Sequence, residues 1–380
     1  MQKKKKILLL SNYRKDRQFS MLQFGEIMLG NSGHYENLPI KEIFPLPLFG
    51  KLPLPTKLTK WASYIDKFLI FPKRLTKYLE QNQSIALVHV IDQSNSPYLK
   101  TVRKSSLSKR LITCHDLIAV RTALGNFPTA TKTSATGKRL QKWILDSLPL
   151  ADFYACDSEQ TKKDLNRIVS KSSKYSKVIH LGTERSSDHQ ANSNNLNPDL
   201  YFDPSETNYI LHVGSAAWYK NRTAVFISFL HAKNQHNIKD LKLILVGPTP
   251  QPHEMNAELS SSLKKHSQDV ICLENITYEA LSALYIDANL LLFPSFIEGF
   301  GWPPLEAASV NCQVISTKTG AINELLNKYA NFVDSNNQQS INQTVVKVLA
   351  EKRKEIKVSL PSIEDCRKNY FQLYMDLLGN

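Results

Sequence analysis

Two glutamates lie eight positions apart in the stretch PSFIEGFGWPPLEAAS, residues 294–309. Glu298 and Glu306 flank a loop that holds Gly299 and Gly301. The glycines permit a tight turn that brings a ligand close to backbone N–H groups. The helix expected from the two prolines onward has a positive N-terminal end that suits phosphate. Carboxylates instead accept hydrogen bonds from neutral hydroxyls, which a sugar and a ribose supply. Taken alone, Glu306 would be an ordinary glutamate in the first turn of a helix. The combined pattern indicates a nucleotide-sugar site.

The surrounding chain alternates short apolar runs with helical patterns. The runs cover residues 6–12, 85–92, 110–117, 152–158 and 177–182 in the first half, and 209–215, 241–248, 270–275, 289–295 and 313–318 in the second. Runs of this kind are typical of parallel strands that are buried on both faces. Repeated alternation with helices predicts α/β domains with doubly wound parallel sheets. The glutamate loop then follows a strand at its carboxyl end, where open α/β sheets bind ligands.

A polar segment over residues 184–208, rich in Ser and Asn and holding two prolines, separates the two halves. It is typical of a linker between domains that move relative to each other. We therefore predict an N-terminal Rossmann-like domain over 1–185, a linker over 186–206, a C-terminal Rossmann-like domain over 207–360, and a closing helix over 361–380. The apolar spacing in that helix leaves open which domain it packs on.

Composition adds a charge asymmetry and a compartment. Residues 1–200 hold 32 Lys and Arg against 16 Asp and Glu, a balance of +16. The remaining residues hold 16 against 18, a balance of −2. The basic half is either a solvated surface or one that meets an anionic partner.

The five cysteines lie far apart without metal-ligand or disulfide spacing, and the apolar run at 7–10 is too short for a signal peptide, so we expect a cytoplasmic protein.

At this point the chain resembles the retaining glycosyltransferases of family 4, which have the GT-B fold of two Rossmann-like, doubly wound domains facing a central cleft. PSFIEGFGWPPLEAAS matches the Glu-x7-Glu motif of that family. The flanking stretches ITYEALSALYIDANLLLFPS and CQVISTKTGAINELL are also typical of it. ILHVGSAAWYKNR, CHDLI and DSEQTKKDL resemble its other motifs. The likeness covers most of residues 85–330.

The resemblance implies roles for individual residues. Glu306 would hold the ribose hydroxyls, and Glu298 would contact the donor sugar. Lys220 would neutralise the diphosphate with help from Arg222, and His115 would lie by the reacting centre unless it is simply a hydrogen-bonded histidine of the interior. Further donor contacts are expected from Gly214, Ser215, Asn221, Gly299, Phe300 and Gly301. Acceptor-side candidates in the first domain are Asp92, Gln93, Ser94 and Asp116.

Two departures from the family pattern affect these expectations. Tyr219 and Ser215 stand where members often carry an arginine, so one diphosphate cation is missing or replaced by Arg222. The loop after the first strand, SNYRKDRQFSM, has none of the paired glycines that many members have. We therefore expect an unusual acceptor side.

The expected reaction transfers a hexose, mannose-like or glucose-like, from a GDP- or UDP-sugar to a hydroxyl of a glycan, a lipid-linked or a small acceptor. We expect neither a cofactor nor a metal, since no Asp-x-Asp motif or histidine cluster is present. Basic residues beside apolar stretches in the first 80 positions suggest a peripheral contact with an anionic membrane, at the inner face.

The other interpretations are a catalytically silent GT-B protein that binds sugar or nucleotide, a sugar phosphorylase on the same fold, and a basic nucleic-acid-binding protein. The last lacks any recognisable binding module, so we expect no nucleic acid partner.

Overall fold

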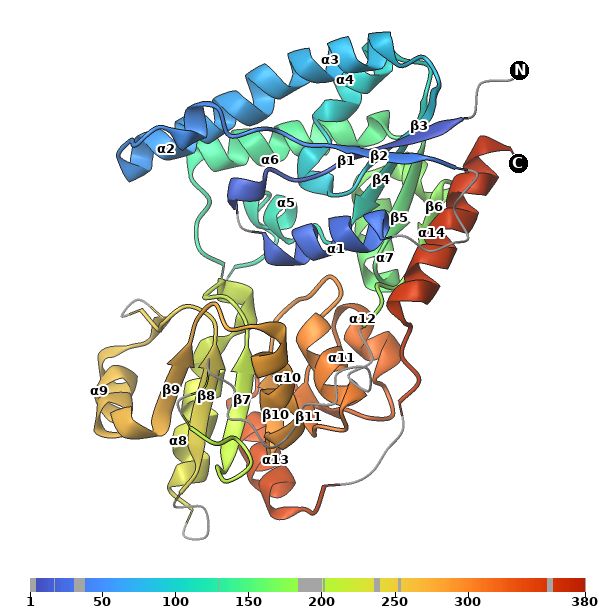
Figure 1. Ribbon diagram of the computed structural model, residues 1–380. Helices are drawn as coiled ribbons and strands as arrows, with labels where there is room; N and C mark the ends of the chain where they lie inside the picture. Colours follow the sequence, from blue (N-terminus) through green and yellow to red (C-terminus); the bar gives the residue numbers. More distant parts are fainter. Residues whose placement is uncertain are drawn as a thin grey trace. The chain divides into compact units, whose positions relative to one another are not determined.

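The computed structural model describes residues 5–16, 18–30, 38–128, 130–183, 200, 202–235, 240–251, 254–353 and 358–379. The chain forms two compact units. The first joins Met1–Leu181 to Ile363–Asn380, and the second is Gly182–Ser362. The linker predicted over 186–206 lies largely outside the described residues. Each unit is an α/β domain built around one sheet (Figure 1).

The sheet of the first unit is wholly parallel, with the strand order β2-β1-β3-β4-β5-β6. Its strands are β1 (Lys6–Leu10), β2 (Ile40–Ile43), β3 (Ile85–Val90), β4 (Lys109–Cys114), β5 (Phe153–Cys156) and β6 (Ser176–Val178). Its helices are α1 (Phe19–Leu29), α2 (Thr56–Ile65), α3 (Phe71–Gln81), α4 (Tyr98–Ser105), α5 (Ile118–Ala123), α6 (Ala135–Ser147), α7 (Glu159–Ile168) and α14 (Ile363–Leu378). A π-helical segment, Asp66–Ile70, joins α2 to α3.

Alternate residues of these strands point to opposite faces of the sheet. Leu8, Leu10, Val88 and Val90 belong to one buried cluster with apolar side chains of α3, α4 and α6. On β3 the residue between the two valines, His89, meets α14 instead, since its Nδ1 lies 2.8 Å from the hydroxyl of Tyr374. Helices therefore cover both faces, and the closing helix packs on the first unit.

The second unit repeats the plan, with the strand order β12-β11-β10-β7-β8-β9 and all pairs parallel. Its strands are β7 (Tyr209–Val213), β8 (Lys242–Val246), β9 (Val270–Leu273), β10 (Leu290–Phe293), β11 (Val314–Ser316) and β12 (Asn331–Phe332). Its helices are α8 (Arg222–Lys233), α9 (Ala257–Lys265), α10 (Tyr278–Asp287), α11 (Trp302–Ser309), α12 (Gly320–Leu325) and α13 (Gln338–Ala350). One face of the sheet packs against α8 and α13 around Phe226, Phe229 and Val345.

Both strand orders contain a point where the chain reverses its direction of travel across the sheet. In the first unit this point lies between β1 and β3, and in the second between β7 and β10. At such a point the connections leave the sheet in opposite directions, and open α/β sheets bind their ligands at the carboxyl ends of the two strands. The residues that follow these four strands are therefore the first place to look for a site.

Among the described residues, none of the helices is both long and apolar enough to span a bilayer.

Candidate functional site

The residues that follow β7 and β10 meet in a buried ion pair. The Nζ atom of Lys220 lies 2.9 Å from Oε1 and 3.1 Å from Oε2 of Glu298. The Lys220 side chain is 14% exposed and that of Glu298 is 7% exposed. The ammonium also lies 4.8 Å from the centre of the Phe293 ring, which ends β10. The structure thus brings together the two predicted donor-site charges at the switch point of the second sheet.

Asn221 fixes the lysine loop to the glutamate loop. Its backbone is left-handed, with φ of 52°, which directs the chain from the short turn at Trp218–Lys220 into α8. Its side-chain amide donates hydrogen bonds to the carbonyl oxygens of Pro294 and Ser335, at 3.1 and 3.2 Å. Asparagine tolerates this conformation better than most residues. The predicted donor residue Asn221 therefore acts on the position of the loops.

Glycines let the glutamate loop pass close to the start of α12. A Cβ at Gly320 would lie 2.6 Å from the carbonyl oxygen of Gly299, and its φ of +55° also favours glycine. Gly301 has φ of +88°, and a Cβ there would lie 2.5 Å from the Ile322 side chain. The backbone N–H of Glu298 donates to Oγ1 of Thr319 at 2.9 Å. These contacts leave little freedom to the loop that presents Glu298.

Glu306 lies on α11, one turn into the helix, and its carboxylate is held by a neighbour. The buried hydroxyl of Tyr285, on α10, donates to Glu306 Oε2 at 2.9 Å. Burial raises the pKa of Tyr285 well above its usual value, and the Glu306 charge raises it further, so the tyrosine remains a donor. Tyr285 orients the second glutamate, and the sequence reasoning did not include it.

Three other residues that were predicted to bind the sugar donor contact mainly other parts of the protein. Gly214 approaches the backbone of Gly247, where a Cβ would lie 2.1 Å from the Gly214 carbonyl oxygen. Ser215 is exposed, and its hydroxyl accepts a long hydrogen bond of 3.4 Å from the N–H of Ala217. The Arg222 side chain is 3% exposed, and its Nε lies 3.4 Å from Oε2 of Glu254. Because its side chain is almost fully buried, Arg222 would have to change position to reach a diphosphate.

The switch point of the first sheet holds a polar network in which Asp92 is central. Nδ2 of Asn12, which follows β1, donates to Asp92 Oδ2 at 2.5 Å. The backbone N–H and the hydroxyl of Ser94 donate to the same carboxylate, both at 2.8 Å. Asn95 donates in turn to Asn12 Oδ1 at 2.9 Å. Two predicted acceptor-side residues, Asp92 and Ser94, thus lie together, and Asn12 joins them although sequence reasoning did not name it.

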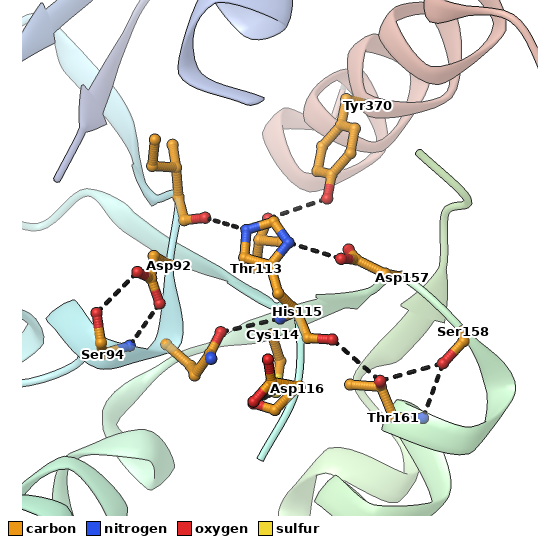
Figure 2. Close-up of polar contacts among 12 residues, drawn as sticks. Asp92, Ser94, Thr113, Cys114, His115, Asp116, Asp157, Ser158, Thr161 and Tyr370 are labelled. Carbon is orange, nitrogen blue, oxygen red and sulfur yellow. Dashed lines mark hydrogen bonds and ion pairs between the residues drawn. The ribbon is translucent and has the colours of Figure 1, made fainter. Parts of the chain in front are cut away.

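His115 is buried and bonded at both ring nitrogens (Figure 2). Nδ1 lies 2.6 Å from Oδ2 of Asp157, and Nε2 lies 2.8 Å from the carbonyl oxygen of Ile91. Burial lowers the pKa of His115, but the charge of Asp157 and its hydrogen bond outweigh burial, so that the pKa rises to about 9. At neutral pH the ring is therefore an imidazolium that donates from both nitrogens.

The remaining two predicted residues support the same region. The side-chain oxygen of Gln93 accepts from the N–H of His115 at 2.9 Å. Asp116 Oδ1 accepts from the N–H of Ile118, the first residue of α5, at 2.9 Å. Both contacts shape the backbone around His115.

Within the described ranges, no three His, Cys, Asp or Glu side chains come together as a group that could hold a metal ion. His115 and Lys220 each pair with a carboxylate, so the Glu298 carboxylate is already bound to an ammonium. The donor set of the second unit therefore fits an anion beside hydroxyls better than it fits a cation.

Comparison with known proteins bears on the second unit first. Residues 199–361 match the family model described as Glycosyl transferases group 1. Over 148 residues the chain is 28% identical to the O-antigen chain mannosyltransferase RfbU of Salmonella typhimurium, strain LT2. That match covers 39% of this chain and 40% of the relative, and so spans well under half of the curated protein.

Solved structures resemble the whole chain. Sucrose-phosphate synthase from Thermosynechococcus elongatus has a TM-score of 0.68 at 17% identity, with 99% of each chain covered. An alpha,alpha-trehalose-phosphate synthase (UDP-forming) from Burkholderia vietnamiensis has a TM-score of 0.60 at 10% identity, with 99% of this chain and 97% of that chain covered. At these identities the likeness concerns the fold, and it confirms the predicted pair of Rossmann-like domains with parallel sheets. The chain therefore has the GT-B fold, and its residues 199–361 are similar to the family described as Glycosyl transferases group 1.

Proposed function

We propose that the protein is a hexosyltransferase of family 4 that moves a sugar from a nucleoside-diphosphate sugar to a hydroxyl and retains the anomeric configuration. One observation carries the proposal. Lys220 and Glu298 form a buried ion pair at the switch point of the domain that matches the glycosyl transferases group 1 model. A cation for the diphosphate and an acceptor for sugar hydroxyls thus lie at the place where this class of sheet binds its ligands.

The donor would divide its contacts among three side chains. Glu306, oriented by Tyr285, would accept hydrogen bonds from the two ribose hydroxyls. Lys220 would bind the diphosphate, and backbone N–H groups of the glycine loop would add to it. Glu298 would turn to the hydroxyls of the transferred sugar. In the structure Glu298 holds the ammonium of Lys220, so donor binding must loosen that pair.

In the proposed step the bond between the anomeric carbon and the diphosphate oxygen breaks, and the acceptor oxygen bonds to the same face of that carbon. The sugar has oxocarbenium character in between. The leaving diphosphate gains negative charge, which Lys220 stabilises where it develops, so that the barrier falls. The acceptor's proton passes to the leaving phosphate oxygen, which balances the step.

The state of His115 supports this assignment of the base. A histidine that is charged at neutral pH donates hydrogen bonds and cannot take a proton from the acceptor hydroxyl. Its pKa of about 9 and its pairing with Asp157 fit a donor in the acceptor-side domain. We propose that His115 acts by positioning the loops of Ile91 and Asp157, to which its two ring nitrogens donate, and that the leaving group provides the base.

Three finer features are also proposed. The relative named a mannosyltransferase favours a mannosyl donor. The structural neighbour named UDP-forming makes a UDP-sugar the alternative donor. The reaction needs no metal or cofactor, since Lys220 supplies the positive charge. The enzyme works on the cytoplasmic side, in peripheral contact with an anionic membrane, on a glycan or lipid-linked acceptor.

A donor screen tests the proposal. Thermal unfolding of the full chain is measured with UDP, GDP and ADP and with their glucose and mannose derivatives, since a bound ligand stabilises by mass action. One nucleotide series should raise the unfolding temperature, and the matching sugar donor should be consumed slowly with release of the nucleoside diphosphate. Protection without consumption, even with added glycan or lipid acceptors, would identify a catalytically silent binder. Absence of protection by any nucleotide would overturn the site.

A further inference from the structure

Exposed apolar side chains gather in one short part of the first unit. Of the 13 large hydrophobic side chains that are exposed among the described residues, eight lie between Leu46 and Leu69. Leu58 is 51% exposed and Trp61 is 56% exposed, and their spacing of three places them on the same face of α2. Soluble proteins seldom expose clustered side chains of this size without a partner.

Asp66 holds the two pieces of this region together. It is 1% exposed, and its carboxylate accepts from the N–H groups of Phe49 and Gly50 at 2.9 and 2.8 Å. The hydroxyl of Tyr13 donates to the same carboxylate at 2.9 Å. The loop at residues 46–54 therefore lies against the helix at 56–70. We call the exposed apolar side chains of these two segments the 46–69 surface.

A cavity of about 690 Å³ adjoins this surface. The helix contributes Lys60, Tyr64 and Lys67 to its lining, and the loop after β1 contributes Lys15 and Asp16. Lys67 pairs with Asp16 at 2.6 Å, and Lys15 donates to the carbonyl oxygen of Gly50. Lys60 has no hydrogen-bond or ion-pair partner among the described residues, and its Nζ lies 6.0 Å from the centre of the Tyr64 ring. Three lysines against one aspartate leave the cavity with two excess positive charges.

A basic cavity at the edge of an exposed apolar surface suits a ligand with an anionic head and an apolar tail. A phospholipid in a bilayer has its anionic headgroup at the surface and its apolar tails beneath it. Each well-placed lysine near an anionic leaflet contributes about 1 kcal/mol to the binding free energy. Aromatic and leucine side chains enter the boundary between headgroups and acyl chains, as amphipathic helices do. Leu54 lines the cavity and is 37% exposed, so that it joins the apolar surface to the basic cavity.

We propose that the 46–69 surface docks on a bilayer that contains anionic phospholipid, and that the cavity lined by Lys15, Lys60 and Lys67 binds a lipid phosphate. This proposal names the residues that would make the peripheral membrane contact of the proposed function. Only the biological purpose of the contact rests on that function. The binding itself requires neither a sugar donor nor turnover.

The test is sedimentation of the full chain with phosphatidylcholine vesicles, with and without phosphatidylglycerol, at low and moderate salt. Binding should need the anionic lipid and weaken as salt screens it. Lys60→Glu changes the charge by two units at a side chain without a hydrogen-bond or ion-pair partner among the described residues, and should lower partition onto anionic vesicles by at least about tenfold. Lys163→Glu makes the same change at an exposed site on α7 and serves as the control.

The apolar part is tested separately with Leu58→Ser, matched by Leu107→Ser at a leucine that is fully exposed elsewhere. Only Leu58→Ser should reduce binding. Quenching by brominated lipid should also be lost in Trp61→Phe. All variants are first compared with the parent by thermal unfolding, which identifies any that fail to fold.

Equal or negligible recovery on neutral and anionic vesicles would overturn the proposal. So would equal effects of the Lys60 and Lys163 changes, which would remove the cavity from the binding site. A concentration-dependent dimer that Leu58→Ser abolishes, without vesicle binding, would show that a second copy covers the surface. A parent that binds vesicles but no nucleotide would leave docking intact and overturn only the proposed function.

Discussion

Glu298→Gln should make the protein bind free nucleoside diphosphates more tightly while it slows sugar transfer. The change keeps the size of the side chain and removes its charge. In the parent, Lys220 gives two hydrogen bonds to Glu298, at 2.9 and 3.1 Å, which a diphosphate must displace. A hydrogen bond to a charged group contributes about 1.5–3 kcal/mol net. Release of Lys220 should therefore raise the affinity for a nucleoside diphosphate by roughly 10- to 100-fold.

The same change should destabilise the ligand-free protein. It leaves the ammonium of Lys220, which is only 14% exposed, without its counter-charge. Removing one partner of a buried ion pair costs about 3–5 kcal/mol. The double variant Lys220→Met with Glu298→Gln removes both charges, so it should recover most of the free energy of unfolding but not the affinity for diphosphate.

Isothermal titration with UDP and with GDP measures the affinity, and urea unfolding measures the stability. Glu258→Gln, at an exposed position on α9, provides the control for a lost carboxylate in the same domain. The competition between Glu298 and the diphosphate is refuted if the folded Glu298→Gln protein binds both nucleotides no more tightly than the parent. Unchanged turnover would separately remove Glu298 from the sugar site.

Three further outcomes are expected. Glu306→Ala should weaken nucleotide-sugar binding by about 1.5–3 kcal/mol, and Tyr285→Phe by about 1 kcal/mol, because one removes a charged acceptor and the other only its orienting donor; titration that finds the second loss larger would contradict this order. His115, whose pKa is raised to about 9, should contribute about 3 kcal/mol of stability that is complete below pH 6.5 and lost as pH rises through 9. Urea unfolding across that range should show the loss in the parent and not in His115→Gln; equal slopes would place the titration elsewhere. Sugar transfer should survive EDTA, and loss of activity that magnesium or manganese restores would contradict a metal-independent reaction.

The sequence predicted ten strands, and all ten are present, because most are apolar runs that both faces of a sheet can bury. The edge strand β6 is only half-buried. It missed β2, where Lys41 and Glu42 interrupt the apolar pattern at an edge of the sheet, and the two-residue strand β12. Strand ends were predicted too far along the chain, as in 85–92 against Ile85–Val90, because Ile91 continues the apolar run beyond the strand and Asp92 already caps the following turn.

Within the site, the sequence motifs predicted Lys220, Glu298 and Glu306. Each motif is a short stretch of the chain, so that the residue types and their spacing can be read directly from the sequence. Their partners are set by tertiary contacts. Tyr285 reaches Glu306 from another helix, and Asp157 reaches His115 across 42 positions. Both residues lie in stretches that resemble family motifs, DSEQTKKDL and ITYEALSALYIDANLLLFPS, but the sequence does not show which side chain each of them meets. The two charges of the Lys220 pair were both expected, but as binders of separate parts of a donor and not as each other's partner.

The position of α14 has a consequence for synthesis. The helix belongs to the first unit, yet it follows the whole second unit in the chain. Tyr374 bonds to His89, and the hydroxyl of Tyr370 lies 3.0 Å from Thr113 Oγ1, at the centre of the first sheet. A ribosome therefore completes the second unit while one face of the first sheet is covered by α1 but still lacks α14. The second domain can fold as it emerges, but the first exposes to water the side chains that α14 later buries. A fragment that stops at residue 183 should therefore need α14 added back as a separate peptide before it becomes compact.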